Sequence, residues 1–563
     1  MKKYLFFLLL LLIIGLESIT QSLEWVTSYD KAKYARVLDI TSDSEGNIYS
    51  TGYFDAYVDF DPGPDELIIQ PVGSMDIYLQ KLDPNGNLHW AFGFGSWEYD
   101  AGLSLCIDEE DNIYLAGRFN GSIDFDPGEE TFYLNSNGES DAYIIKMNPN
   151  GNLLWAKSFG SETGYECCNG ICVDNEGNIL STGYFRDTVD FDPGTTVYNL
   201  SSVGFNDAFI LKLDSEGNFI WVKNIGGTSW DKGTSIYSDP QGNIYTTGQF
   251  KGTMDVELVS SQITLTSSGD RDVYIVKQNS IGDFQFAVSM GGVEEDLSYS
   301  IIVDDNENVY SSGYFQETAD FDPGVGVENF TSNGGMDFYI QKLDPSGNYI
   351  WAHTFGKSSE DHAFEVALDE YNNVYSAGYF HYTVDFDPGA DEFKLTSSEY
   401  GSAFILKLDP DGQFVYALAT EGPSSEIART IHVSKVGIMY VSGDFQGTVD
   451  FDPGPNIQNL TGSVDGCAYI QKFNYLNSIA NIAGSCDFKL ISNPVNEILE
   501  LSFDKPIRDI LIIITSMEGS KLFEREFHYL QNPKIDVSKL SSGFYLISVI
   551  NHGEVNTLKF IKE

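Results

Sequence analysis

Pairs of aspartates recur along the chain with the spacing Asp-x-Asp-Pro-Gly. In an extended segment, side chains two residues apart point the same way, so the two carboxylates of a pair converge. Converging carboxylate oxygens beside turn carbonyls suit a hard cation such as Ca²⁺. Asp and Pro-Gly are also ordinary turn formers, and Asp bonds its own backbone. Two interpretations stay open, a calcium site or a repeated turn, for Asp59 and Asp61, Asp124 and Asp126, Asp190 and Asp192, Asp320 and Asp322, Asp385 and Asp387, and Asp450 and Asp452.

A second column of acids precedes the expected first strand in six of the seven repeating units, and the first unit has Ala35 at this position. The loop entering strand one and the loop between strands two and three lie at the same end of a four-stranded antiparallel unit, so both acidic columns are expected to rim one face. The column either ties neighbouring units together or forms an anionic ligand face. Its members are Asp100, Glu166, Asp231, Asp296, Asp361 and Glu426.

Catalytic motifs are not found. The sequence contains no Gly-x-Ser-x-Gly, no His-Glu-x-x-His and no phosphate-cradling glycine loop. Paired carboxylates formally permit glycoside chemistry, but an active site is usually one asymmetric place and these acids recur in nearly every unit. The sequence predicts a binding or scaffold protein with a glycan or protein ligand and no catalytic residues. A secreted glycosidase or lyase, and a calcium-stiffened spacer, are the alternatives.

The charge balance of the chain argues against two classes of binding partner. There are 83 acidic against 32 basic residues, for a formal net charge of −51. So acidic a surface repels nucleic acid and anionic lipid, and we expect neither as a partner. Hydrophobic residues make up 42% of the chain and aromatics 14%, which is enough for a packed core.

A repeat of about 65 residues positions both acidic columns. Gly-x-Phe followed by Val-Asp-Phe-Asp-Pro-Gly, or a close variant, occurs seven times, and the fourth copy keeps Asp255 but loses Pro-Gly. Alternating β-branched and aromatic residues, separated by Gly, Asn, Asp and Pro turns, predict four strands per unit, in the second unit at 102–108, 113–119, 142–147 and 153–159. Four antiparallel strands repeated seven times predict an all-β fold, a seven-bladed β-propeller over residues 23–475.

An aromatic column indicates how the ring closes. Each expected fourth strand carries one aromatic residue, and the seventh unit lacks that strand. Residues 23–29 fit the missing pattern, with Trp25 in the aromatic column, so the N-terminal strand is expected to complete the last blade.

The repeat resembles a known bacterial family. Residues 141–146 read Asp-Ala-Tyr-Ile-Ile-Lys, and a Pro-x-Gly-Asn turn and a Trp follow them. This combination resembles the SBBP-type β-propeller repeat over residues 23 to about 475, and the resemblance implies a propeller.

The two ends of the chain carry different signals. Residues 1–22 combine Lys2 and Lys3 with an apolar run at 5–16 and small residues at a cleavage site, which predicts a signal peptide and no transmembrane segment in the mature chain. Residues 476–487 read as a linker. Short alternating strands in 488–563 predict a small C-terminal β-sandwich.

This C-terminal segment resembles the type A sorting domain of the type IX secretion system of Bacteroidetes. The matching residues are Asn493-Pro494, the turn at 517–519, the segment 535–540, Ser542 to Tyr545 and the closing run 557–562. The resemblance implies recognition by the type IX machinery, export across the outer membrane, and secretion or attachment to the cell surface.

Overall fold

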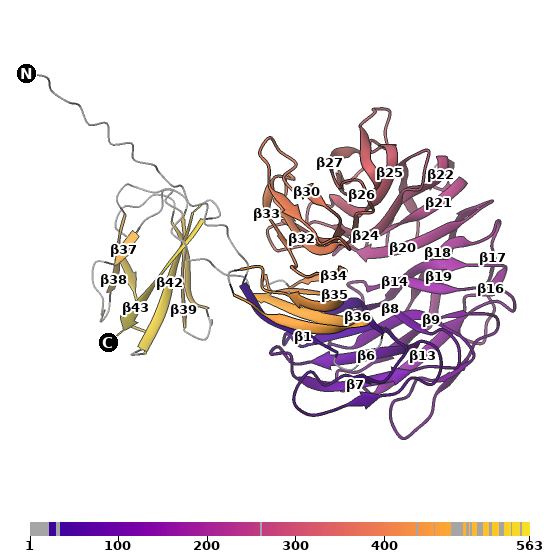
Figure 1. The fold of residues 1–563 in the computed structure, drawn as a ribbon, viewed down its shortest axis with the longest axis horizontal. Helices are drawn as coiled ribbons and strands as arrows, with labels where there is room; N and C mark the ends of the chain where they lie inside the picture. The colour runs from indigo at the N-terminus through magenta and orange to yellow at the C-terminus, as the bar shows by residue number, and fades with distance from the viewer. Residues whose placement is uncertain are drawn as a thin grey trace, which may run out of the picture. The chain divides into compact units, whose positions relative to one another are not determined.

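A computed structural model describes residues 22–29, 34–258, 262–434, 437–454, 456–474, 488–490, 495, 498–503, 510–516, 521–527, 534–541, 543–551 and 554–562. Residues 22–474 form one compact unit, and the described strands from Phe488 onward belong to another. The described residues form strands and turns and contain no helix (Figure 1). No helix of the described chain is long and apolar enough to cross a membrane. Residues 1–21 of the signal peptide predicted at 1–22, the linker 476–487, Asn493-Pro494, residues 517–519 and Ser542 lie outside the described residues.

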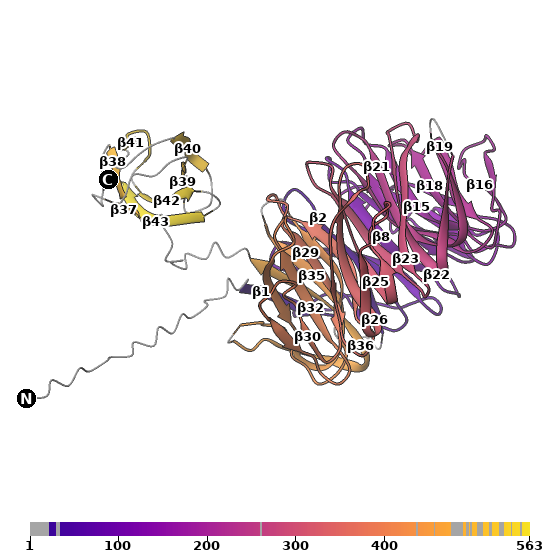
Figure 2. The same ribbon diagram turned by 90° about the horizontal axis from the view of Figure 1, so that it is seen from above.

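Within residues 22–474 the described strands pair as seven four-stranded antiparallel units, which follow one another side by side (Figures 1 and 2). The third, fourth and fifth are joined at their edges by β19–β21 and β23–β25 pairing. The strands of each repeat, from first to fourth, are as follows: repeat 1 has β2 (Ala35–Ser42), β3 (Ile48–Phe54), β6 (Asp76–Leu82) and β7 (Leu88–Phe94), repeat 2 has β8 (Ala101–Ile107), β9 (Ile113–Phe119), β12 (Asp141–Met147) and β13 (Leu153–Phe159), and repeat 3 has β14 (Cys167–Val173), β15 (Ile179–Phe185), β18 (Asp207–Leu213) and β19 (Phe219–Gly227). Repeat 4 has β20 (Asp231–Ser238), β21 (Ile244–Glu257), β22 (Gln262–Gln278) and β23 (Phe284–Gly292), and repeat 5 has β24 (Leu297–Val303), β25 (Val309–Asp320), β26 (Asn329–Leu343) and β27 (Tyr349–Phe355). Repeat 6 has β28 (His362–Leu368), β29 (Val374–Phe380), β32 (Ser402–Leu408) and β33 (Phe414–Ala419), and repeat 7 has β34 (Glu426–Val433), β35 (Met439–Asp450), β36 (Asn459–Asn474) and, as its fourth strand, β1 (Ser22–Ser28).

Turns built around an aspartate connect successive strands within the repeats. Asp43 Oδ1 accepts the backbone N–H groups of Glu45 and Asn47 at 3.1 and 2.8 Å. Gly46 sits between them with φ of 82°, a left-handed conformation that suits glycine. The same Asx geometry recurs between first and second strands and between third and fourth strands, so these turns set the register of each sheet.

The connection between the second and third strands of a repeat was expected to be a loop, but in the structure it contains a β-hairpin. In repeats 1, 2, 3 and 6 it folds back as a short hairpin, whose strands are β4 (Val58–Asp59) with β5 (Ile68–Ile69), β10 (Ser122–Asp124) with β11 (Tyr133–Asn135), β16 (Thr188–Asp190) with β17 (Asn199–Ser201), and β30 (Thr383–Asp385) with β31 (Lys394–Thr396). In repeats 4, 5 and 7 the same hairpin is continuous with long strands such as β21 and β22.

The last repeat contacts the first as neighbouring repeats contact each other. Trp25 of β1 donates its indole N–H to the Pro84 carbonyl at 3.2 Å, as Trp155 does to the Ser215 carbonyl of the following repeat at 3.2 Å. Lys472 Nζ donates to the same Pro84 carbonyl at 2.8 Å. The first strands contact one another in succession, and β34 also contacts β2. The N-terminal strand thus supplies the outer strand of the seventh sheet and links it to the first.

The C-terminal unit has two sheets. One contains β37 (Phe488–Leu490), β38 (Ile498–Phe503) and β41 (Lys534–Asp536), and the other β40 (Lys521–Phe527), β39 (Ile510–Ser516), β42 (Gly543–Asn551) and β43 (Glu554–Lys562). Leu499 and Leu501 of the first sheet share a buried cluster with Ile512, Ile514 and Ile547 of the second. A core shared by two facing sheets is a β-sandwich arrangement.

Candidate functional site

The paired aspartates hold their own loops. Asp59 Oδ1 accepts the backbone N–H groups of Asp61 and Leu67 at 3.2 and 2.9 Å, and Asp61 Oδ1 accepts that of Gly63 at 2.7 Å. The other five pairs, Asp124/Asp126, Asp190/Asp192, Asp320/Asp322, Asp385/Asp387 and Asp450/Asp452, make the same three bonds. One oxygen of every carboxylate therefore stabilises the turn.

Metal ligation by these pairs stays a prediction. Among the residues that the structure describes, no group of three or more His, Cys, Asp or Glu side chains is placed to hold a metal ion. Calcium at a pair would take its further oxygens from backbone carbonyls and water.

The second acidic column lies in the interior. Asp100, Glu166, Asp231, Asp296, Asp361 and Glu426 are all at most 2% exposed. Asp100 accepts the N–H of Ser96 at 2.6 Å and that of Asn120 at 2.7 Å, so it ties the loop before the first strand to the end of the second. The same two-loop clamp recurs at Asp231, Asp296 and Asp361. Ligand binding by this column stays a prediction.

Burial raises the pKa of these carboxyl groups. The pKa is about 6 for Asp100, about 7 for Asp231 and about 8 for Glu426, with burial the largest cause in each. Neighbouring carboxyls at the start of the third strands, such as Asp207 beside Asp231, raise the pKa further by charge repulsion. These groups keep their protons to higher pH than exposed carboxylates do.

A cavity of about 370 Å³ is lined by the first strands of all seven repeats. That volume lies in the range of small-molecule sites. Each first strand has a one-residue irregularity in its pairing with the second strand, and the residue at the irregularity lines the cavity. Bulges of this kind re-aim side chains. The seven bulged residues are Leu38, Leu103, Asn169, Thr234, Tyr299, Phe364 and Arg429. We call this space the first-strand cavity.

In several repeats, the residue after the bulge ties neighbouring repeats together. Asp39 Oδ2 accepts the N–H of Leu105 at 2.8 Å, and Glu365 Oε2 accepts that of Ile431 at 2.9 Å. Ser235 Oγ accepts the equivalent N–H of Ile301 at 3.3 Å. Burial raises the pKa of Asp39 to about 6 and that of Glu365 to about 8. The two acids therefore occupy positions where a serine makes the same bond elsewhere.

Aromatic side chains and one arginine gather at and beside one part of the cavity wall, where Tyr299, Phe364 and Arg429 line it. His362 Nδ1 lies 3.2 Å from the Tyr299 hydroxyl, and its ring stacks on Tyr379 with centroids 5.0 Å apart. Burial lowers the pKa of His362 to about 4, so the imidazole is neutral at physiological pH. Arg429 pairs with Asp444, and its guanidinium lies 5.5 Å from the Phe364 ring centroid.

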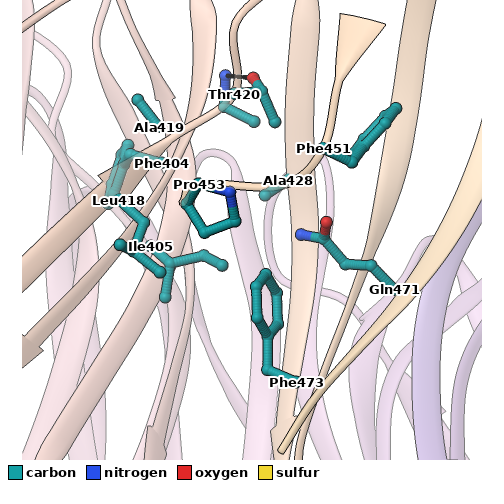
Figure 3. A pocket seen from close by; sticks show the side chains of 11 residues that line it. Phe404, Ile405, Leu418, Ala419, Thr420, Ala428, Phe451, Pro453, Gln471 and Phe473 are labelled. Carbon is teal, nitrogen blue, oxygen red and sulfur yellow. Dashed lines mark hydrogen bonds between the residues drawn. The ribbon is translucent and has the colours of Figure 1, made fainter. Parts of the chain in front are cut away.

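A second hollow lies in the seam between repeats 6 and 7 (Figure 3). Phe404, Leu418, Phe451 and Phe473 line it, and its volume is about 10 Å³. That is room for about one water molecule, so the seam is a packing feature.

Sequence reasoning missed the bulged column and the middle residue of Gly-x-Phe. That middle residue pairs with the start of the first strand, as Tyr53 does with Arg36 and Tyr379 with His362. The sequence does contain a signal for this position, because it varies between repeats. The flanking Gly and Phe occur in all seven repeats, while the middle residue is Tyr, Arg, Gln or Asp.

Comparison with known proteins assigns the C-terminal unit. A family model described as "Secretion system C-terminal sorting domain" matches residues 490–563. This unit is a type IX sorting domain. The chain is therefore exported, to be secreted or attached to the cell surface, and the sorting domain interacts with the secretion machinery.

Relatives of the repeat region are distant. An uncharacterized WD repeat-containing protein of Acanthamoeba polyphaga mimivirus is 23% identical over 507 residues, which covers 76% of this chain and 36% of that protein. Regulatory protein FlaEY of Caulobacter vibrioides is 24% identical over 170 residues, 30% of this chain and 17% of that protein. The chain thus spans about a third or less of these relatives. A crystal structure of a protein of unknown function from Bacteroides thetaiotaomicron matches 77% of this chain and 98% of its own, at 12% identity and a TM-score of 0.19.

Proposed function

We propose that residues 22–474 form a closed, seven-bladed β-propeller of the SBBP type. Seven four-stranded antiparallel units, contacts between successive first strands, and the Trp25 and Lys472 bonds to Pro84 support closure. The WD repeat-containing relative fits the same architecture. Each repeat is then one blade, and the first-strand cavity is the central channel.

The exported propeller binds an extracellular glycan at the first-strand cavity. The observation that carries this proposal is the bulged column: seven equivalent positions in otherwise regular repeats hold six different residue types, and all seven line the cavity. A purely structural position in a repeat is expected to keep the residue that packs best. Ligand sites combine apolar walls with a few polar groups, as Tyr299, Phe364, Asn169 and Arg429 do here.

A glycan array and pull-down against extracellular polymers test the binding proposal with the full-length chain. Tyr299→Ala with Phe364→Ala is expected to weaken any binding at least about tenfold. Tyr133→Ala removes an equally aromatic but 58% exposed side chain on the outer hairpin and serves as the control. Silence on both assays, or equal binding by both variants, contradicts the proposal. A protein captured through the same cavity residues replaces the glycan as ligand.

A second candidate is an enzyme acting on polysaccharide. Its support is the unrepeated grouping of Tyr299, Glu365 and Arg429 on the cavity wall, with His362 in contact with the Tyr299 hydroxyl. Glu365 already bonds the Ile431 N–H, and Asp39 the Leu105 N–H, which favours positioning over catalysis for the two acids. Release of reducing ends from a bound polysaccharide, abolished by Glu365→Gln with folding intact, supports the enzyme instead.

A further inference from the structure

The arginines of the propeller gather at one edge of their sheets. Neighbouring strands are antiparallel, so the starts of first and third strands and the ends of second strands share an edge. All five arginines of residues 22–474 lie there, in a chain with 83 acidic and 32 basic residues. They are Arg36 in β2, Arg118 near the end of β9, Arg186 after β15, Arg271 before the Asp272 position of β22, and Arg429 in β34.

Some cations at this edge have no carboxylate partner among the residues that the structure describes. No ion pair within the described chain includes Arg36, Arg118, Arg186 or Lys232, although Arg271 and Arg429 are paired. The Nε atoms of Arg36 and Arg118 are buried without a hydrogen-bond partner. Lys232 lines the cavity, and its Nζ lies 5.7 Å from the Tyr184 ring centroid. Buried donors without partners are costly, so an anion at this place gains charge-assisted bonds.

Exposed aromatic rings lie at the same edge, in the same blades. Trp97, Tyr99, Tyr165 and Trp230 precede the first strands of blades 2 to 4, and Phe205 precedes the third strand of blade 3, with 45 to 81% of each exposed. The Phe205 and Trp230 rings stack with centroids 5.7 Å apart, and the Arg186 guanidinium lies 4.3 Å from Phe205.

The other side of the ring differs in charge. The positions equivalent to Tyr165 and Trp230 are Glu295 and Glu360 in blades 5 and 6. We call the edge formed by Arg118, Arg186, Lys232 and the five aromatic residues of blades 2 to 4 the cationic sector.

We propose that the cationic sector binds an acidic oligosaccharide, one that carries uronic acid carboxylates. The C–H faces of pyranose rings pack on exposed aromatic rings, and the guanidinium and ammonium groups take the carboxylates. The chain's net charge of −51 opposes a long polyphosphate, which favours a short acidic glycan over nucleic acid. This inference rests on the proposed glycan-binding function and names its ligand class.

Isothermal titration of the full-length chain with oligogalacturonate and with maltohexaose tests the inference. Oligogalacturonate is expected to bind, more weakly as salt rises, and maltohexaose is not. Arg118→Gln with Lys232→Gln is expected to lower the affinity at least about tenfold, and Trp230→Ala to lower it several-fold. Tyr400→Ala, which removes a 62% exposed aromatic at the same edge of blade 6, is the matched control.

The two proposals fail in distinguishable ways. Maltohexaose binding that depends on Tyr299 and Phe364 overturns the acidic ligand and leaves glycan binding standing. No carbohydrate binding of any kind overturns both. Tighter binding of a single-stranded oligonucleotide than of oligogalacturonate overturns the acidic glycan in favour of nucleic acid. Because Trp230 is exposed, its variant remains informative if the Arg118 and Lys232 double variant loses stability.

Discussion

Replacement of Lys212 by methionine tests a buried ion pair whose lysine also bonds the next repeat. Lys212 Nζ lies 2.8 Å from Asp174 Oδ2, and the two side chains are 4 and 2% exposed. The same ammonium donates to the Ser280 carbonyl of the next repeat at 3.1 Å. Removal of one partner from a buried pair leaves an uncompensated charge, which costs about 3–5 kcal/mol.

The double variant separates charge from packing. Lys212→Met with Asp174→Asn removes both charges, and the asparagine oxygen still accepts the Glu176 and Asn178 N–H groups that Asp174 accepts at 2.9 Å. We expect the double variant to recover about 2 kcal/mol of the loss, since neither buried charge remains. Urea unfolding monitored by tryptophan fluorescence, with the slope compared between variants, gives the free energies.

An exposed ion pair supplies the control. The Lys394 and Glu392 side chains are 48 and 68% exposed, so Lys394→Met is expected to leave the unfolding midpoint unchanged. A buried charge left without its partner is expected to destabilise the fold. This expectation would be refuted if Lys212→Met lowered the free energy of unfolding by less than about 1 kcal/mol, or if the loss in the double variant equalled the sum of the losses in the two single variants.

Three further predictions concern closure, pH and metal. Trp25→Ala is expected to cost about 2–4 kcal/mol of unfolding free energy, since the partly buried indole packs on Gly86 and bonds Pro84; an unchanged urea midpoint contradicts it. Asp231 has a folded pKa of about 7 against about 3.9 unfolded, so its contribution is fully present below about pH 4 and lost as pH rises to about 7. The melting temperature is expected to be higher at pH 5 than at pH 8, and Asp231→Asn to flatten that difference. Melting in excess Ca²⁺ and in chelator is expected to agree, because the paired aspartates already hold their turns; a calcium-dependent rise would make those turns metal sites.

Much of the architecture follows from local chemistry that is visible in the sequence. Strand two of the second repeat was predicted at 113–119 and strand four at 153–159, and both are confirmed by β9 and β13. The sorting domain was predicted from short motifs and is confirmed by the family match to 490–563. Periodicity and turn residues are properties of neighbouring positions, so one sequence suffices for them.

The candidate site depended on information that no single repeat carries. The bulge at Tyr299 is a backbone irregularity between two strands, and alternation alone places that residue no differently from its neighbours. The deep burial of Asp231 was missed because acids before a strand are usually exposed, whereas here the side chain turns inward to bond Gly227 and Lys251. Which side chains share the cavity depends on the packing of all seven repeats.

The placement of β1 makes the order of synthesis matter. β1 is made first, yet its partner β36 ends at Asn474, so the seventh sheet lacks its outer strand until nearly the whole repeat region exists. Until β36 is made, β1 has no partner strand, and an unpaired strand edge is a template for aggregation. Bringing together strands so far apart in sequence is slow, because the loop-closure entropy is lost before the contacts form. The sorting domain, matched at 490–563, comes after β36 in the chain, so the segment that directs export emerges only after the last strand needed for closure.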